Sequence, residues 1–141
     1  EQLQSELPTD LPTGVVHGDI FPDNVIADGN RICAILDFEE VAVESLVLDL
    51  AMAFVGCGWV DNAPNRACWD ALLGGYEGVR PLLQKERKSL PLYVHYAALG
   101  IAAWRFGQFV LLQPQLQEQA RFEQMIARID RPHGGLLPWG E

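Results

Sequence analysis

Three polar side chains, Asp19, Asn24 and Asp37, interrupt residues 14–40, which otherwise consist mainly of apolar residues and turns, GVVHGDIFPDNVIADGNRICAILDFEE. A carboxylate can orient a hydroxyl group and accept its proton, and carboxylate and amide oxygens are the hard ligands that Mg²⁺ prefers. Together, these three groups could therefore carry out proton transfer beside a divalent cation. That chemistry requires a fold that places them in one site.

A β-hairpin is expected to bring the three groups together. Residues 25–27 and 31–38 have the apolar pattern of two strands, and Asp28-Gly29-Asn30 between them is typical of a hairpin turn. If paired residue numbers sum to 57 or 58, Asp37 lies opposite position 20 or 21, beside Asp19 and the loop toward Asn24. Residues 15–16 are expected to form a short strand that leads into this loop.

Helices are expected beyond residue 40. Pro64, Pro91 and Pro114 are each placed at the start of a helix, where proline is tolerated, and Gly74-Gly75 is placed at a helix end. The expected helices are residues 45–55, 64–73, 82–89, 91–112 and a last one from 114, followed by an irregular tail at 133–141. The predicted fold class is α+β and mostly α-helical.

Composition limits the kind of protein and its partners. The 141 residues, 49% of them hydrophobic, can bury one domain core and contain no uncharged apolar run of membrane-spanning length. A net charge of −9 opposes binding to nucleic acid or to an anionic membrane surface. The N-terminus resembles no secretory signal and lacks Met, as in a processed or excised segment. Cys33, Cys57 and Cys68 are expected to be buried, reduced thiols of a cytoplasmic protein.

The spacing of the polar residues matches a motif of phosphoryl-transfer enzymes. His17-Gly18-Asp19 and Asn24 form the pattern H-x-D-x-x-x-x-N, and Asp37-Phe38 closes an apolar strand thirteen residues after that Asn. This order is that of a kinase catalytic loop and its metal-binding Asp. The motif predicts Asp19 as the catalytic base, and Asn24 and Asp37 as ligands of Mg²⁺ bound with ATP.

Several motifs in the same order resemble a known superfamily. HGDIFPDN, ILDFEE and the LDLA that contains Asp49 resemble the aminoglycoside phosphotransferase and choline kinase superfamily, which has a protein-kinase-like fold. Within it, LPTGVVHGDIFPDNV is similar to the catalytic segment of type II bacterial homoserine kinases. The run AWRF at 103–106 stands where those kinases carry an arginine-phenylalanine step on a late helix. The resemblance covers most of residues 11–112.

The resemblance begins at the C-terminal lobe of such a kinase. No glycine-rich phosphate loop and no strand lysine partnered with a helix glutamate are found in the sequence, and residues 1–10 leave no room for them. Residues 1–141 are therefore expected to be one C-terminal lobe with a catalytic-loop hairpin, whose partner is the N-terminal nucleotide lobe of the same protein. Alone, the segment is expected to have little or no activity.

Two polar residues are expected to support the site without reacting. By analogy with kinases, His17 braces the catalytic loop by packing and hydrogen bonding. Asp49, the only charge of an apolar helix, should be costly to bury without partners, so it is expected to accept hydrogen bonds from backbone amides of that loop. His95 and His133 have no ligand-spaced partners and are assigned no metal.

Several charged and aromatic residues are candidates for the substrate-binding site. Glu39 replaces the Gly of the protein-kinase Asp-Phe-Gly motif; with Glu40 and Glu44 it could face a substrate ammonium or form a solvated acidic rim. Arg105 could bind a substrate carboxylate or form an internal ion pair with a glutamate. Trp59 and Trp104 are expected in the core rather than as binding platforms.

The leading hypothesis is an ATP-dependent kinase that phosphorylates a hydroxyl group of a small amino alcohol or amino acid, with L-homoserine as the first candidate. Choline, ethanolamine, hydroxylysine or an aminosugar such as an aminoglycoside remain alternative substrates. A hypothesis of a different class is a non-catalytic helical scaffold. The intact triad of Asp19, Asn24 and Asp37 favours the enzyme.

Overall fold

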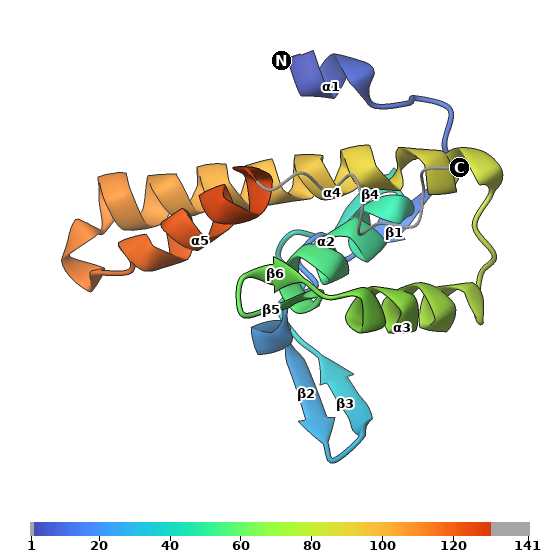
Figure 1. The fold of residues 1–141 in the computed structure, drawn as a ribbon, viewed down its shortest axis with the longest axis horizontal. Helices are drawn as coiled ribbons and strands as arrows, with labels where there is room; N and C mark the ends of the chain where they lie inside the picture. The colour runs from blue at the N-terminus through green and yellow to red at the C-terminus, as the bar shows by residue number, and fades with distance from the viewer. Residues whose placement is uncertain (1, 131–141) are drawn as a thin grey trace.

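A computed structural model describes residues 2–130 and shows a mixed α+β fold with a majority of helix, as predicted (Figure 1). The helices are α1 (Gln2–Glu6), α2 (Val47–Cys57), α3 (Arg66–Glu77), α4 (Gln84–Arg105) and α5 (Gln119–Asp130). The strands are β1 (Thr13–Val16), β2 (Val25–Asp28), β3 (Arg31–Ile35), β4 (Ala42–Ser45), β5 (Trp59–Val60) and β6 (Ala63–Pro64). Short 3₁₀ turns at Pro22–Asn24 and Pro114–Leu116 and a π-helix at Phe106–Leu112 complete the described chain.

The core lies where the long helix α4 meets α2, α3 and α5. Figure 1 shows α5 returning along α4 after the turn that joins them, with α2 on the side of α4 toward α3. Apolar side chains from all four helices are fully or almost fully buried there, among them Phe54, Trp69, Leu90, Val94 and Met125. Burying each large apolar side chain contributes about 1.5–3 kcal/mol, so this packing anchors the elements that carry the site.

The strands of the described residues pair as three separate two-stranded antiparallel sheets, β1–β4, β2–β3 and β5–β6. Strand β4 corrects the expectation that the chain is helical throughout beyond residue 40. Its partner β1 lies about thirty positions earlier, with Thr13 opposite Ser45, so no local pattern reveals the pairing. Val15 and Val43 face each other across this ribbon and are each 72% exposed.

The β2–β3 hairpin is present but its predicted register was wrong. Val25 pairs with Ile35 and Asp28 with Arg31, so paired numbers sum to 59 or 60 rather than 57 or 58. The turn contains only Gly29 and Asn30, with Gly29 at φ 57°, and the register shifts again between Ile26 and Ala27. The hairpin projects away from the helices (Figure 1).

Helix α4 corrects the prediction of two helices separated at Pro91. The helix runs unbroken from Gln84 to Arg105 with Pro91 inside it. Leu90 and Val94 on either side of the proline are fully buried against the core. A proline inside a helix removes one hydrogen bond, and here the packing of the neighbouring turns outweighs that loss.

The other predicted helix boundaries also shift. Helix α3 begins at Arg66, after Asn65, whose side chain accepts a hydrogen bond from the Cys68 amide at 3.0 Å; Pro64 lies in β6 instead. The helix continues through Gly74-Gly75 because the fully buried Trp69 ties it to the core. The last helix begins at Gln119, and Pro114 opens only a 3₁₀ turn.

Two further features are the apolar character of the helices and the exposure of the cysteines. Among the described helices, none combines the length and apolar character needed to cross a membrane. All three cysteines are free, but Cys33 is exposed and the other two are half-buried, so the expectation of buried thiols was wrong. Position 33 lies on a strand of the projecting hairpin, where no core covers it. The predicted irregular tail and His133 lie outside the described residues.

Candidate active site

His17 ties the loop after β1 to the segment after β3. Its ring is buried, and Nε2 donates to the Leu36 carbonyl at 2.9 Å, while Nδ1 accepts from the Asp19 amide at 3.2 Å. These two bonds require the neutral tautomer that carries its proton on Nε2, since a carbonyl oxygen can only accept. The ring also lies against Phe38, with 4.7 Å between ring centroids. These contacts match the bracing role expected for His17.

Asp49 makes the hydrogen bonds predicted for it. Its two carboxylate oxygens accept from the backbone amides of His17 and Gly18, each at 2.8 Å. The residue lies in the first turn of α2, whose free amides and dipole favour a negative charge. Helix α2 packs into the core, so Asp49 fixes the backbone of the loop relative to the helical body.

Gly18 is required by the conformation of this loop. Its φ of 83° lies in the region that residues with a Cβ rarely adopt, and a Cβ placed there would be 2.6 Å from the Glu40 carbonyl oxygen. The backbone of the loop therefore passes directly against residue 40. This close approach places the segment that contains Glu39 and Glu40 beside Asp19.

Asp19 and Asn24 form one hydrogen-bonded unit across the loop. The Asn24 amide nitrogen donates to the Asp19 carboxylate at 2.8 Å and to the Asp19 carbonyl at 3.0 Å. Burial raises the pKa of the Asp19 carboxyl; the hydrogen bond from Asn24 lowers it, and the nearby charges of Asp23 and Asp37 raise it again. Because Asn24 turns its NH₂ toward Asp19, its amide oxygen is left for another partner.

Asp37 enters the site from the other arm of the hairpin. The Leu36 amide donates to the Asn24 carbonyl at 2.9 Å, which extends the hairpin pairing up to Asp37. Asp37 then adopts φ 61°, a left-handed conformation that Asp and Asn tolerate better than most residues. This turn in the backbone places the exposed Asp37 on the same pocket as Asp19 and Asn24.

A pocket of about 510 Å³ contains the predicted triad, and its volume is typical of small-molecule sites. The loop after β1, within residues 18–24, and the segment after β3, within residues 37–40, form one wall, and α2, α4 and α5 supply the rest. Its lining residues are Gly18, Asp19, Phe21, Asp23, Asn24, Asp37, Glu39, Glu40, Met52, Gly100, Ile101, Trp104, Arg105 and Arg121. Sequence positions from 18 to 121 therefore meet in one site.

The residues of this pocket fit Mg²⁺ better than they fit a metal held by protein ligands alone. Within the described part of the chain, no group of three or more His, Cys, Asp or Glu side chains could hold a metal ion. The Asn24 amide oxygen and the Asp37 carboxylate are two hard oxygen donors on one pocket. Mg²⁺ is commonly held by one or two such groups, with water and phosphate oxygens completing the shell.

Arg105 lines the pocket, and one of its two predicted contacts, an internal ion pair with a glutamate, is not formed. Its guanidinium donates to the Arg121 carbonyl at 2.8 Å and to the Gln124 side chain at 3.3 Å. Neither partner is a glutamate, so the internal ion pair expected as one alternative is replaced by neutral acceptors. The side chain is only 6% exposed, which leaves little of it for a ligand.

The other candidate residues differ in their exposure and in whether they line the pocket. Glu39 and Glu40 are exposed and both line the pocket, whereas Glu44 is exposed on β4. Trp104 was expected in the core, but it is 57% exposed and lines the pocket, with its ring edge against Phe109. Trp59 is half-buried. Position 104 lies near the end of α4, where the core no longer covers that face of the helix.

The sequence reasoning missed two charged residues of the pocket. Asp23 lies within the quoted HGDIFPDN motif, so its position next to Asn24 was a usable signal. Arg121 lies on α5, and its side chain pairs with Asp23 at 3.6 Å. No local pattern identifies Arg121, because only the packing of α5 on α4 brings it to the loop.

Comparison with known families identifies the class of protein to which this loop and pocket belong. Residues 1–82 match the phosphotransferase enzyme family. That match covers more than half of the 141 residues, so the chain belongs to this family. The resemblance inferred from HGDIFPDN, ILDFEE and LDLA is confirmed at the level of the family.

Individual relatives narrow the likeness further, to proteins named homoserine kinases. The protein from Granulibacter bethesdensis is 36% identical over 122 residues, which cover 81% of this chain and 38% of that protein. The one from Brucella anthropi is 34% identical over 135 residues, covering 88% and 41%, and the one from Chelativorans sp. is 40% identical over 111 residues, covering 78% and 34%. The chain thus spans about a third to two fifths of the length of these curated relatives.

Proposed function

We propose that this chain is the C-terminal lobe of an ATP-dependent kinase that phosphorylates the hydroxyl group of L-homoserine. One observation carries the proposal: the Asp19 carboxylate accepts a hydrogen bond from Asn24 in a pocket that also holds Asp37. The names of the relatives support homoserine as the substrate. Under this proposal the chain forms the second lobe of a protein-kinase-like enzyme, with β2–β3 as its catalytic-loop hairpin.

In the proposed reaction Asp19 is the catalytic base. Its carboxylate accepts a hydrogen bond from the substrate hydroxyl and aims the oxygen at the γ-phosphorus of ATP. As the new oxygen–phosphorus bond forms and the bond to the β-phosphate breaks, the hydroxyl proton passes to Asp19. Asn24 holds the carboxylate through its NH₂, so the base is oriented before substrate binds.

Asn24 and Asp37 are the proposed holders of Mg²⁺. A bound Mg²⁺ ion would neutralise the charge that develops on the transferred phosphoryl group. The two side chains differ usefully, because Asn24 offers a neutral oxygen and Asp37 a charged one. His17 and Asp49 position the loop through the backbone contacts described above and touch no reacting atom.

The proposal assigns residues 1–141 to one lobe, with an N-terminal nucleotide lobe of the same protein as its partner. The lengths of the curated relatives leave room for such a lobe. Both lobes are then needed for turnover. We place the protein in the cytoplasm, because three free cysteines suit a reducing compartment.

Release of ADP by the complete two-lobed protein tests this function. The assay supplies ATP and Mg²⁺ and offers L-homoserine, choline, hydroxylysine or an aminosugar as the acceptor. Homoserine-dependent turnover is expected, and Asp19→Asn should reduce kcat by about 10²–10⁴-fold, as removal of a general base does. Asp70→Asn is the matched control, because Asp70 forms only an exposed ion pair with Arg66 on α3.

The other outcomes separate the remaining hypotheses. Turnover with a different alcohol, still abolished by Asp19→Asn, would retain the mechanism and replace homoserine. Equal activity of Asp19→Asn and Asp70→Asn would refute Asp19 as the base. A folded two-lobed protein that releases no ADP with any acceptor would favour the scaffold hypothesis.

A further inference from the structure

Two arginines line the pocket, but they differ in how much of each guanidinium is available to a ligand. Arg105 is 6% exposed, and Nη1 is committed to the Arg121 carbonyl and the Gln124 side chain. Its guanidinium carbon also lies 5.9 Å from the centre of the Phe21 ring, which covers it further. A cation held on several sides by its own chain is a poor site for a substrate.

The side chain of Arg121 is 45% exposed and faces the same pocket. Its guanidinium carbon lies 5.4 Å from the centre of the Phe109 ring, and a nitrogen lies 3.6 Å from the Asp23 carboxylate. That separation is longer than the 2.7–2.9 Å typical of a charge-assisted hydrogen bond. The guanidinium is therefore restrained by a ring and a weak ion pair, and it keeps donors that a ligand can reach.

We infer that Arg121 binds the carboxylate of the amino-acid substrate, and that Arg105 is a positioning residue that holds Arg121 in place. The inference rests on the proposed function, because it assigns the acceptor end of that same reaction. It assigns the carboxylate to Arg121 instead of Arg105, for which the sequence left open carboxylate binding or an internal ion pair. Arginine suits this task because its planar guanidinium can bind both oxygens of a carboxylate.

The charges of the pocket explain why a substrate carboxylate needs an accessible cation there. Five acidic residues line it: Asp19, Asp23, Asp37, Glu39 and Glu40. A substrate carboxylate would be repelled by this group unless a cation met it. Of these five, Glu39 and Glu40 have no other assigned role, and their charge favours the substrate ammonium group. An amino acid with a hydroxyl side chain therefore matches the pocket at both charged ends, with Arg121 as the carboxylate contact.

Arg105 helps to hold Arg121 in this position. Its hydrogen bond to the Arg121 carbonyl joins α4 to the first turns of α5, directly at the residue whose side chain reaches the pocket. Burial lowers the pKa of Arg105, and the charge of Arg121 lowers it further. Arg105 is thus a buried link between α4 and α5. Its loss should affect both the packing of α5 and the binding of substrate.

The test compares two acceptors in the complete two-lobed protein. L-Homoserine carries the carboxylate, and 3-aminopropan-1-ol is the same molecule without it. For Arg121→Gln, kcat/KM with homoserine should fall about 10- to 100-fold, mainly through KM, the size expected for losing a charge-assisted hydrogen bond. With 3-aminopropan-1-ol, kcat/KM should change less than about 3-fold. Arg121→Lys, which keeps the charge, should recover part of the homoserine activity.

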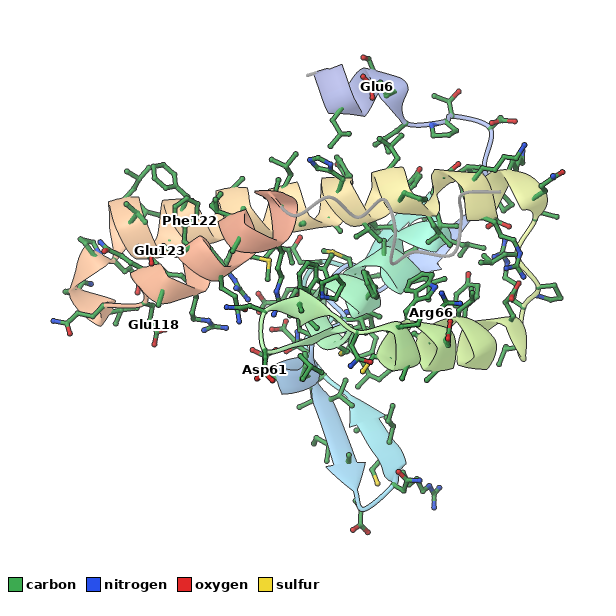
Figure 2. All side chains as sticks on the ribbon, in the orientation of Figure 1. Glu6, Asp61, Arg66, Glu118, Phe122 and Glu123 are labelled. Atoms are coloured by element: carbon green, nitrogen blue, oxygen red, sulfur yellow. The ribbon has the colours of Figure 1, made fainter. Side chains whose placement is uncertain are left out.

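Arg66→Gln is the matched control, because Arg66 is also an exposed arginine in an ion pair, but it lies on α3 rather than on α5, which carries Phe122 and Glu123 (Figure 2). This control should behave as wild type with both acceptors. Arg105→Gln should lower the melting temperature, whereas Arg121→Gln should not. The inference would be overturned if Arg121→Gln lost equal activity with both acceptors, or lost none with homoserine. Homoserine turnover by the wild-type protein would still uphold the proposed function in that case. A wild-type protein without homoserine turnover would overturn both.

Discussion

The Asp49→Asn substitution tests whether Asp49 holds the backbone of the loop after β1 rather than taking part in the reaction. The substitution keeps the shape of the side chain but replaces one carboxylate oxygen by an NH₂ group, which cannot accept from a backbone amide. One of the two 2.8 Å hydrogen bonds, to His17 or to Gly18, is therefore lost. A hydrogen bond to a charged group contributes about 1.5–3 kcal/mol, so the local opening equilibrium of the loop should rise about 10- to 150-fold.

Hydrogen exchange at the backbone amides of His17 and Gly18 measures that opening directly. In Asp49→Asn, at least one of these amides should lose protection by this factor, and kcat should fall because Asp19 is no longer held in position. Asp37→Asn is the matched control: Asp37 is exposed, and Asn tolerates its φ of 61°, so protection should stay unchanged while activity is lost. Equal protection in both variants, or equal loss in both, would refute the division of roles.

Two further predictions concern the frame of the site. Gly18→Ala should lower the free energy of unfolding by at least about 2 kcal/mol, because strain at its positive φ adds to the 2.6 Å contact with Glu40; Gly29→Ala, with open space around it, should cost only about 1 kcal/mol. Urea denaturation of both variants checks this, and equal losses would contradict it. Glu86 is fully buried and accepts from Arg80 at 2.7 Å and from the Leu83 amide at 2.9 Å. Glu86→Gln should therefore cost about 2–4 kcal/mol in the same assay, and a loss below about 1 kcal/mol would show that the ion pair does not stabilise the start of α4.

The meeting of Asp19, Asn24 and Asp37 in one pocket was predictable from sequence because its determinants are local. The spacing of Asp19, Asn24 and Asp37 and the turn at Gly29-Asn30 all fall within a stretch of about twenty residues. Asp49 was predictable for a different reason: a lone charge in an apolar segment needs hydrogen-bond partners, and the loop offers free amides. Even so, a tighter turn and a register shift moved the pairing of the hairpin by about two residues.

The errors at β4, α4 and Arg121 share a physical cause, which is packing between residues distant in sequence. Strand β4 needs β1 as its partner, and Pro91 remains in α4 because Leu90 and Val94 are buried around it. Local propensity gives no information about either contact. The same cause hid Arg121, whose position depends on α5 lying along α4.

The residues of the proposed site are thus held by two different sets of contacts. Asp19 is positioned by Asn24 and, through the loop backbone, by Asp49, all within the first fifty residues. Arg121 is positioned by α5, which is anchored through the fully buried Met125 and the hydrogen bond from Arg105 to the Arg121 carbonyl. The two sets meet at the weak ion pair between Arg121 and Asp23, where the charged atoms lie 3.6 Å apart. A change on the α5 side of the pocket should therefore disturb Asp19, Asn24 and Asp37 little. Under the proposed function, substrate choice can therefore vary through α5 while the residues proposed for phosphoryl transfer are kept.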